Sequence, residues 1–166
     1  MSTDSSTIKR LSSADLPVIL GIVNTAAKKY GGVIPADCYH DPYMTGEEMA
    51  QQMTSMIFYG WSEDDKLIGV AGFQPVADVI LIRHVYVLPE HQGKGVGTKL
   101  LDRLKSLTRT RRLLVGTWAA AYWALGFYQK YGFDFLPHKA EVLARYWPIS
   151  QRQIETSTVL GMELEP

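Results

Sequence analysis

Residues 79–97 read VILIRHVYVLPEHQGKGVG and place a glycine-rich turn between a predicted strand and a predicted helix. The run at 79–87 has the aliphatic and aromatic content of a buried strand, and the leucines that follow the turn recur at helical spacing over about 95–107. Alternate glycines in the turn let backbone N–H groups converge at the positive end of the helix dipole. The junction therefore predicts an anion site that suits a phosphate group.

The composition is that of a soluble globular protein with one domain of 166 residues. Seventeen basic and seventeen acidic residues give zero formal charge, which disfavours a nucleic-acid partner. No apolar run is long enough for a membrane span, and the first residues lack the features of a signal peptide. The single cysteine, Cys38, excludes an internal disulfide. These features predict a cytoplasmic protein that does not bind membranes.

The remaining segments predict one mixed α/β (α+β) domain. Short connections make the strands at 58–62, 67–73 and 79–87 an antiparallel meander, whereas the helix after the turn implies a parallel crossover to a strand at 113–117. Further strands are expected at 8–11, 133–136 and 158–164. Further helices are expected at 16–30, 45–56 and 122–131, and a short one at 140–146 within the ambiguous stretch 138–157.

Two familiar phosphate-binding patterns do not fit the glycine turn. A Walker A loop requires a hydroxyl residue directly after its lysine, and Lys94 is followed by Gly95. A dinucleotide fingerprint requires a third glycine where this chain has Thr98, and it begins immediately after the strand. We therefore expect the turn to bind a different phosphorylated ligand.

Two motifs in the right order resemble the GNAT superfamily of N-acetyltransferases. The segment 92–97 matches Gln/Arg-x-x-Gly-x-Gly/Ala after an aliphatic strand end and a proline turn. The segment 124–133 matches Ala-x-x-Phe/Leu-Tyr-x-x-x-Gly-Phe. The resemblance implies one acetyltransferase domain over 1–166, with a central, mostly antiparallel mixed sheet flanked by helices. It also implies a splay between the fourth and fifth strands.

The resemblance implies acetyl-CoA as co-substrate and no metal. Backbone N–H groups of the turn would hold the pyrophosphate, and the strand end before it would pair with the amides of the pantetheine arm. The cofactor-binding residues implied in this way are Val85, Tyr86, Val87, Gln92, Gly93, Lys94, Gly95, Val96, Gly97 and Thr98.

Tyr128 occupies the position of the family's general acid, which would protonate the CoA sulfur. The frequent asparagine seven positions earlier is Ala121 here, so its contribution is absent or comes from elsewhere. No general base is assigned, because the positions that carry one in some relatives are Leu81 and Arg83. Strand alternation predicts that His84 points to the opposite face of the sheet.

The acceptor is predicted to be a primary amine, most simply that of a small molecule. Tyr39, Tyr43 and Glu141 are candidate contacts to it, through cation–π and ionic interactions. The alternatives are an acetyltransferase for a protein lysine or N-terminus, and a non-catalytic acyl-CoA-binding sensor. Dimers are common in the family, so the resemblance allows a homodimer.

Overall fold

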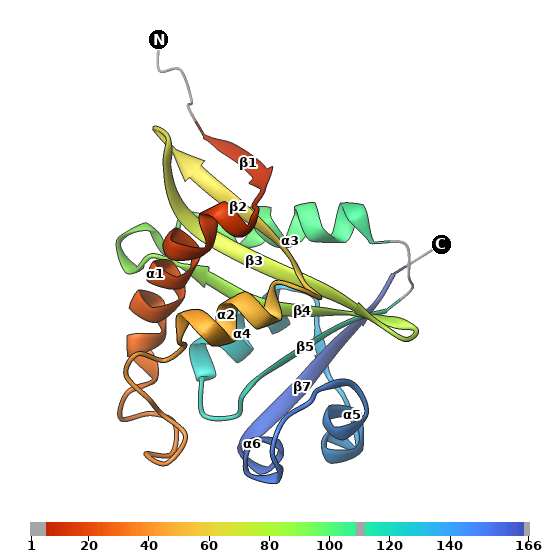
Figure 1. Ribbon diagram of the computed structural model, residues 1–166. Helices are drawn as coiled ribbons and strands as arrows, with labels where there is room; N and C mark the ends of the chain where they lie inside the picture. Colours follow the sequence, from red (N-terminus) through yellow and green to blue (C-terminus); the bar gives the residue numbers. More distant parts are fainter. Residues whose placement is uncertain (1–5, 109–111, 165–166) are drawn as a thin grey trace. The chain divides into compact units, whose positions relative to one another are not determined.

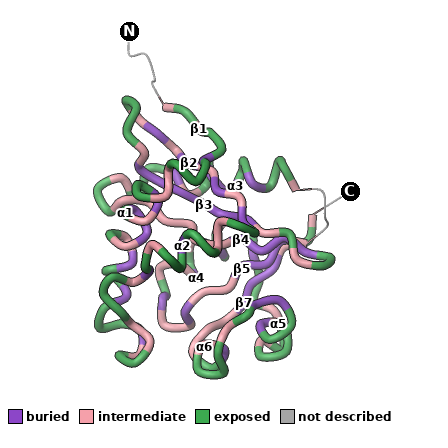
Figure 2. Tube along the Cα trace, in the orientation of Figure 1, coloured by how far each residue is buried: buried purple, intermediate pink, exposed green. Residues whose placement is uncertain are grey.

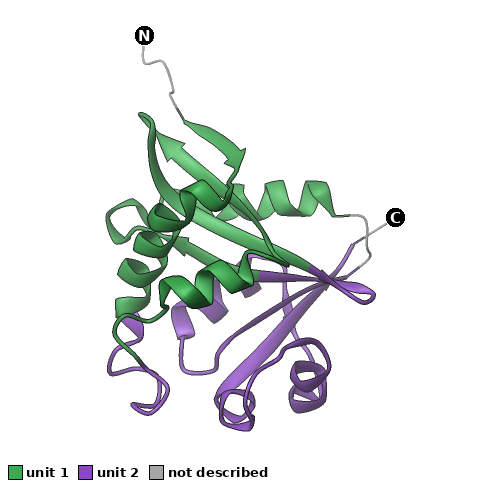
Figure 3. Ribbon diagram, viewed as in Figure 1, with its two compact units in different colours: residues 1–28, 40–74, 83–108 green, residues 29–39, 75–82, 109–166 purple. Residues whose placement is uncertain are grey.

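The computed structural model describes residues 6–108 and 112–164, and it divides the chain into two compact units (Figure 3). The first unit comprises residues 1–28, 40–74 and 83–108, and the second comprises 29–39, 75–82 and 109–166. The prediction that 1–166 form one domain stays a prediction.

Seven strands form a mixed sheet in the order β1-β2-β3-β4-β5-β7-β6 (Figure 1). The strands are β1 Thr7–Arg10, β2 Ile57–Glu63, β3 Lys66–Val76, β4 Val79–Val87, β5 Arg112–Trp118, β6 Asp134–Phe135 and β7 Ser157–Glu163. The predicted neighbours β2, β3 and β4 are confirmed, and β4 pairs in parallel with β5 as the crossover predicts. The mixed, mostly antiparallel sheet of the sequence prediction is therefore correct.

The helices are α1 Leu16–Ala27, α2 Gly46–Gln52, α3 Val96–Leu107, α4 Tyr122–Tyr131, α5 Lys139–Tyr146 and α6 Gln151–Thr156. The first predicted helix ends earlier than expected, because Lys28–Tyr30 continues as a 3-10 turn. α2 also ends before the predicted residue 56. A capping box from Ser150 to Gln153 starts α6, a short helix that the ambiguous stretch did not reveal.

The core of the first unit lies between its strands and the helices α1 and α2. Ile19, Val23 and Met49 pack there with Phe58 and Val70, all of them buried. On the other face of β3, a Cβ added to Gly69 would lie 2.9 Å from Val96 and 3.3 Å from Leu100 of α3. The two faces of these strands are thus covered by different helices, and Figure 2 shows the buried residues following the strands.

The core of the second unit packs α5 and α6 against β5 and β7. Its buried members are Val79, Leu81, Leu114, Leu143, Tyr146, Trp147, Ile154 and Val159. The parallel register of β4 with β5 runs from Ile80–Leu113 to Ile82–Val115. The register ends there although β4 continues to Val87, as the predicted splay between the fourth and fifth strands requires.

Candidate functional site

The loop between β4 and α3 is exposed, and two of its glycines have a left-handed backbone conformation. Gly93 has φ +79° and Gly95, the N-cap residue of α3, has φ +82°, a region that side-chain-bearing residues rarely adopt. A Cβ added at either position would meet nothing within 4 Å. Residues 92–95 are exposed, whereas Val96 is buried and anchors the start of the helix. The loop therefore presents backbone to open space at a helix N-terminus, which suits an anion.

The side chain of Gln92 braces the loop against the end of β4. Its Nε2 donates a hydrogen bond of 2.9 Å to the carbonyl oxygen of Val87. The turn between them is a short 3-10 helix, Pro89–His91, whose His91 N–H donates to the Leu88 carbonyl. Gln92 thus positions the loop, a role that the motif match alone did not reveal.

The end of β4, Val85–Val87, lies beyond the register that pairs this strand with β5. All three residues are half-buried, and Tyr86 packs against the core of the first unit. Alternation places Val87 on the face of α3, where its side chain lies 3.4 Å from a Cβ built on Gly69. In the described residues, the β5 ladder therefore does not use the backbone of this segment.

Tyr128 lies on α4 in the second unit and is 7% exposed. Its ring makes edge contacts with Phe127 and Phe133, at centroid distances of 5.2 and 5.7 Å. Burial, with the neighbouring Tyr30, raises the pKa of its phenol well above the usual range. The hydroxyl therefore stays protonated throughout the neutral range and has a proton to donate.

An aromatic stack lies beside α4 in the same unit. The rings of Tyr30 and Trp123 stack with centroids 5.9 Å apart, and Lys29 Nζ lies 4.5 Å from the Trp123 ring. These contacts join the 3-10 turn after α1 to the first turn of α4, so Trp123 supports this helix.

The three predicted acceptor contacts are divided between the two units. Tyr39 is half-buried in the second unit, and Tyr43 packs against the core of the first. Glu141 is exposed in the first turn of α5, where a carboxylate stabilises the helix dipole. A structural role is thus visible for Tyr43 and Glu141, and their contact with an acceptor stays a prediction.

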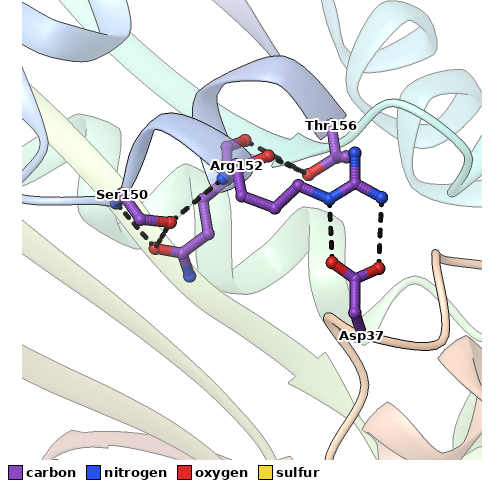
Figure 4. Close-up of polar contacts among 5 residues, drawn as sticks. Asp37, Ser150, Arg152 and Thr156 are labelled. Atoms are coloured by element: carbon purple, nitrogen blue, oxygen red, sulfur yellow. Dashed lines mark hydrogen bonds and ion pairs between the residues drawn. The ribbon is translucent and has the colours of Figure 1, made fainter.

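The segment 29–39 is tied to α6 by an exposed ion pair (Figure 4). Arg152 donates from Nε to Asp37 Oδ2 at 2.9 Å and from Nη2 to Asp37 Oδ1 at 3.1 Å. The guanidinium also lowers the pKa of Asp37. This bidentate contact within the second unit holds an otherwise irregular loop in place.

The predicted alternation at His84 is wrong. Its φ is +55°, so the strand is not extended there, and its side chain reaches Gln52 at the end of α2. His84 Nε2 lies 2.5 Å from Gln52 Oε1, and Arg83 contacts Gln74, which in turn contacts Ser55. The sequence shows that Arg83 and His84 interrupt an apolar strand, but it does not show the polar contacts that they make.

His84 is an uncharged member of this cluster. It lies between the rings of Phe58 and Tyr86, at centroid distances of 6.0 and 6.2 Å. Burial, followed by the nearby charge of Arg83, lowers the pKa of His84 from 6.5 to about 3. The imidazole is therefore neutral at physiological pH.

The described residues lack a metal-binding cluster and a membrane-spanning helix. They contain no group of three or more His, Cys, Asp or Glu side chains that could hold a metal ion. No helix in the same part of the chain has both the length and the apolar character of a membrane span.

Comparison with known proteins gives one family and many similar structures. The model of the acetyltransferase (GNAT) family matches residues 25–133, which include both sequence motifs. The PaiA N-acetyltransferase from Thermoplasma acidophilum, in complex with coenzyme A, has a TM-score of 0.73 and 17% identity, over 96% of this chain and 99% of that one.

Two further structures are similar over nearly their whole length. YncA from Salmonella typhimurium, with its cofactor acetyl-CoA, has a TM-score of 0.67 and 21% identity, over 98% of this chain and 95% of that one. The ribosomal-protein-S18-alanine N-acetyltransferase from Escherichia coli has a TM-score of 0.69 and 18% identity, over 97% of this chain and 95% of that one. At these identities the structures establish the fold.

Proposed function

Because the chain belongs to the GNAT family of acetyltransferases, we propose that it transfers an acetyl group from acetyl-CoA to the primary amine of a small molecule. The observation that carries the proposal is the open loop at the start of α3, where Gly93 and Gly95 leave space for a ligand against the backbone. Structures of similar fold that contain coenzyme A or acetyl-CoA support the choice of donor. The proposal treats residues 1–166 as one acetyltransferase domain.

The donor is held by backbone rather than by charged side chains. N–H groups of residues 93–98 bind the pyrophosphate at the N-terminus of α3, because the Gln92 N–H already donates to the Pro89 carbonyl. Lys94, exposed in the loop, adds a positive charge near the phosphates. The segment Val85–Val87 pairs with the amides of the pantetheine arm as an added strand would, using backbone that β5 does not engage.

The reaction requires a neutral amine, a polarised thioester and a protonated leaving group. The amine nitrogen attacks the carbonyl carbon, and the backbone N–H of Tyr86 or Val87 stabilises the negative charge that develops on the carbonyl oxygen. The C–S bond then breaks and the CoA sulfur leaves as a thiolate. The amine loses its proton to water or to a base.

Tyr128 is the proposed general acid: its phenol donates a hydrogen bond to the sulfur as the C–S bond breaks, and solvent supplies the proton that the CoA thiol finally carries. The raised pKa supports this role in one respect, since the donor is always protonated at neutral pH. The raised pKa also makes complete transfer of the proton from Tyr128 to the CoA thiolate unfavourable. A thiol with an ordinary pKa near 8.5 is a much stronger acid than this phenol. The main contribution of Tyr128 is thus stabilisation of the developing thiolate.

A thiol-release assay with acetyl-CoA and a panel of amines tests the proposed function. The full chain should release CoA thiol only when an amine is present, and mass spectrometry should find the product 42 Da heavier, as acetylation requires. Binding of acetyl-CoA without transfer to any amine would contradict the enzymatic proposal.

Such a result would favour the non-catalytic acyl-CoA sensor. Peptides with free lysines or N-termini belong in the panel because a protein acceptor is the second alternative. Transfer to peptides, with no transfer to small amines, would replace the small-molecule proposal.

A further inference from the structure

Arg83 is an unusual residue in the first unit because it interrupts the apolar strand β4. Its side chain is half-buried, and Nη1 donates a hydrogen bond of 3.1 Å to Gln74 Oε1. Gln74 Nε2 in turn donates to Ser55 Oγ at 3.3 Å. The positive φ at His84 brings a second polar side chain, bonded to Gln52, to the same side of the strand. We call these five residues the Arg83 cluster.

The cluster carries one positive charge and no negative charge. The pairs His91–Glu63 and Arg152–Asp37 do not include Arg83. Desolvation alone lowers the pKa of the Arg83 guanidinium, with no carboxylate acting against it. His84 is neutral, and the other members are amides and a hydroxyl.

An arginine in such a place is costly to the folded protein. A charge removed from water destabilises the fold unless an opposite charge or several hydrogen bonds compensate it. A guanidinium has five N–H donors, and one is used by Gln74. The remaining donors form a planar fork whose geometry matches a carboxylate. Because the side chain is partly exposed, an anion from solvent can reach it.

We propose that Arg83 binds a carboxylate of the acceptor, so that the acceptors are small molecules carrying both an amine and a carboxylate. This inference rests on the proposed function. Arg83 lies two residues before Val85 on the same strand. A carboxylate bound there belongs to a molecule close to the strand end that holds the donor.

A single positive charge favours a carboxylate over a phosphate group. Phosphate sites in proteins combine several cations or a row of backbone N–H groups. In the first unit the loop at 92–98 has those N–H groups, and the Arg83 cluster offers one guanidinium among neutral side chains. The pyrophosphate and the carboxylate thus have separate sites.

Matched acceptors test this inference in the full chain. The thiol-release rate is measured for L-amino acids and ω-amino carboxylates, each against the carboxamide of the same compound. The variants are Arg83→Gln, which removes the charge, and Arg83→Lys, which keeps the charge and loses the fork. Arg103→Gln is the control, since Arg103 is exposed on α3.

The expected preference for carboxylate over carboxamide is about 10- to 100-fold in kcat/KM, mostly through KM, as for a hydrogen-bonded charge. Arg83→Gln should remove that preference and leave the carboxamide rates and the affinity for acetyl-CoA within about twofold, because only uniform binding to the acceptor is lost. Arg83→Lys should retain part of the preference, and Arg103→Gln all of it. The thermal midpoint of Arg83→Gln should not fall, because an unpaired charge is removed.

The inference would be overturned by equal rates for carboxylates and carboxamides, by equal loss for both in Arg83→Gln, or by weaker acetyl-CoA binding in that variant. Binding of acetyl-CoA with transfer to neither set would overturn it as well. If the chain does not bind acetyl-CoA, the proposed function fails, and thermal stabilisation by the same amino carboxylates decides the inference. Stabilisation that Arg83→Gln abolishes supports the anion site, and its absence rejects it.

Discussion

The loop at 92–98 and the helix α4 each carry one of the two sequence motifs, yet they differ in how the fold holds them. The loop is exposed, and its glycines face open space. Tyr128 of α4 is buried among aromatic rings. The loop can therefore change with little effect on the core, whereas most changes at Tyr128 disturb packing and chemistry together.

Because of this difference, the two motifs need different tests. For the loop, the informative quantity is cofactor affinity, and stability serves as the control. For Tyr128, only a substitution that keeps the ring can separate the hydroxyl from the packing.

The largest effect is expected for Gly95→Asp. A carboxylate at the start of α3 would repel the pyrophosphate, and its Cβ would occupy the space left by the glycine. We expect the affinity for coenzyme A, measured by calorimetry, to fall at least about 100-fold, or nearly 3 kcal/mol. The thermal midpoint should fall by only a few degrees, because the cost is that of one strained residue.

Gly32→Asp is the matched control for that variant. Gly32 is also exposed, has φ +78°, and would place a Cβ with no neighbour within 4 Å. It should lose the same stability and keep its affinity for coenzyme A. Equal affinities in the two variants would refute the assignment of the loop.

Tyr128→Phe should give the second largest effect. The change keeps the contacts with Phe127 and Phe133 and removes the proton donor. We expect kcat to fall about 100-fold, the lower range for a general acid, with the affinity for acetyl-CoA nearly unchanged. Tyr122→Phe, on the same helix and 77% exposed, should have normal kcat. Equal turnover in the wild type and Tyr128→Phe would remove the catalytic role.

Stability at alkaline pH should show the burial of Tyr128 directly. Its pKa is raised in the folded state, so above pH 10 the unfolded chain releases this proton while the folded chain keeps it. The free energy of unfolding should therefore fall more steeply for the wild type than for Tyr128→Phe, by about 1 kcal/mol between pH 9 and pH 11. Denaturant titrations at both pH values measure the difference, and parallel curves would mean that the hydroxyl is solvated.

The smallest effect is expected for Lys94→Ala. Because Lys94 is exposed, its charge is screened, and its loss should weaken coenzyme A binding by about threefold at low salt. The difference should disappear at high ionic strength. A salt-independent loss of tenfold or more would mean that side chains, and not the backbone, dominate the loop.

The sequence was sufficient for features that depend on local patterns. Glycine spacing located the loop, and apolar periodicity located the strands β2 to β5 and the helices α3 and α4. The six-residue helix α6 was missed although its capping box is a local signal, because its apolar periodicity is too short to be seen.

The Arg83 cluster could not be predicted for a different reason. It depends on a left-handed residue at His84, which is not glycine, and on contact with Gln52, 32 positions away. Regular alternation is the correct expectation for a strand, and only tertiary structure reveals where it is interrupted.

An NMR titration of the 15N-labelled full chain with coenzyme A shows whether the loop at 92–98 binds the donor. Backbone amides of the loop bind the donor in this account, so the signals of Gly93, Gly95 and Gly97 should shift strongly. Those of Gly32 and Gly126, which are exposed outside the loop, should not move. Saturable binding of coenzyme A that leaves the three loop signals in place would contradict the account.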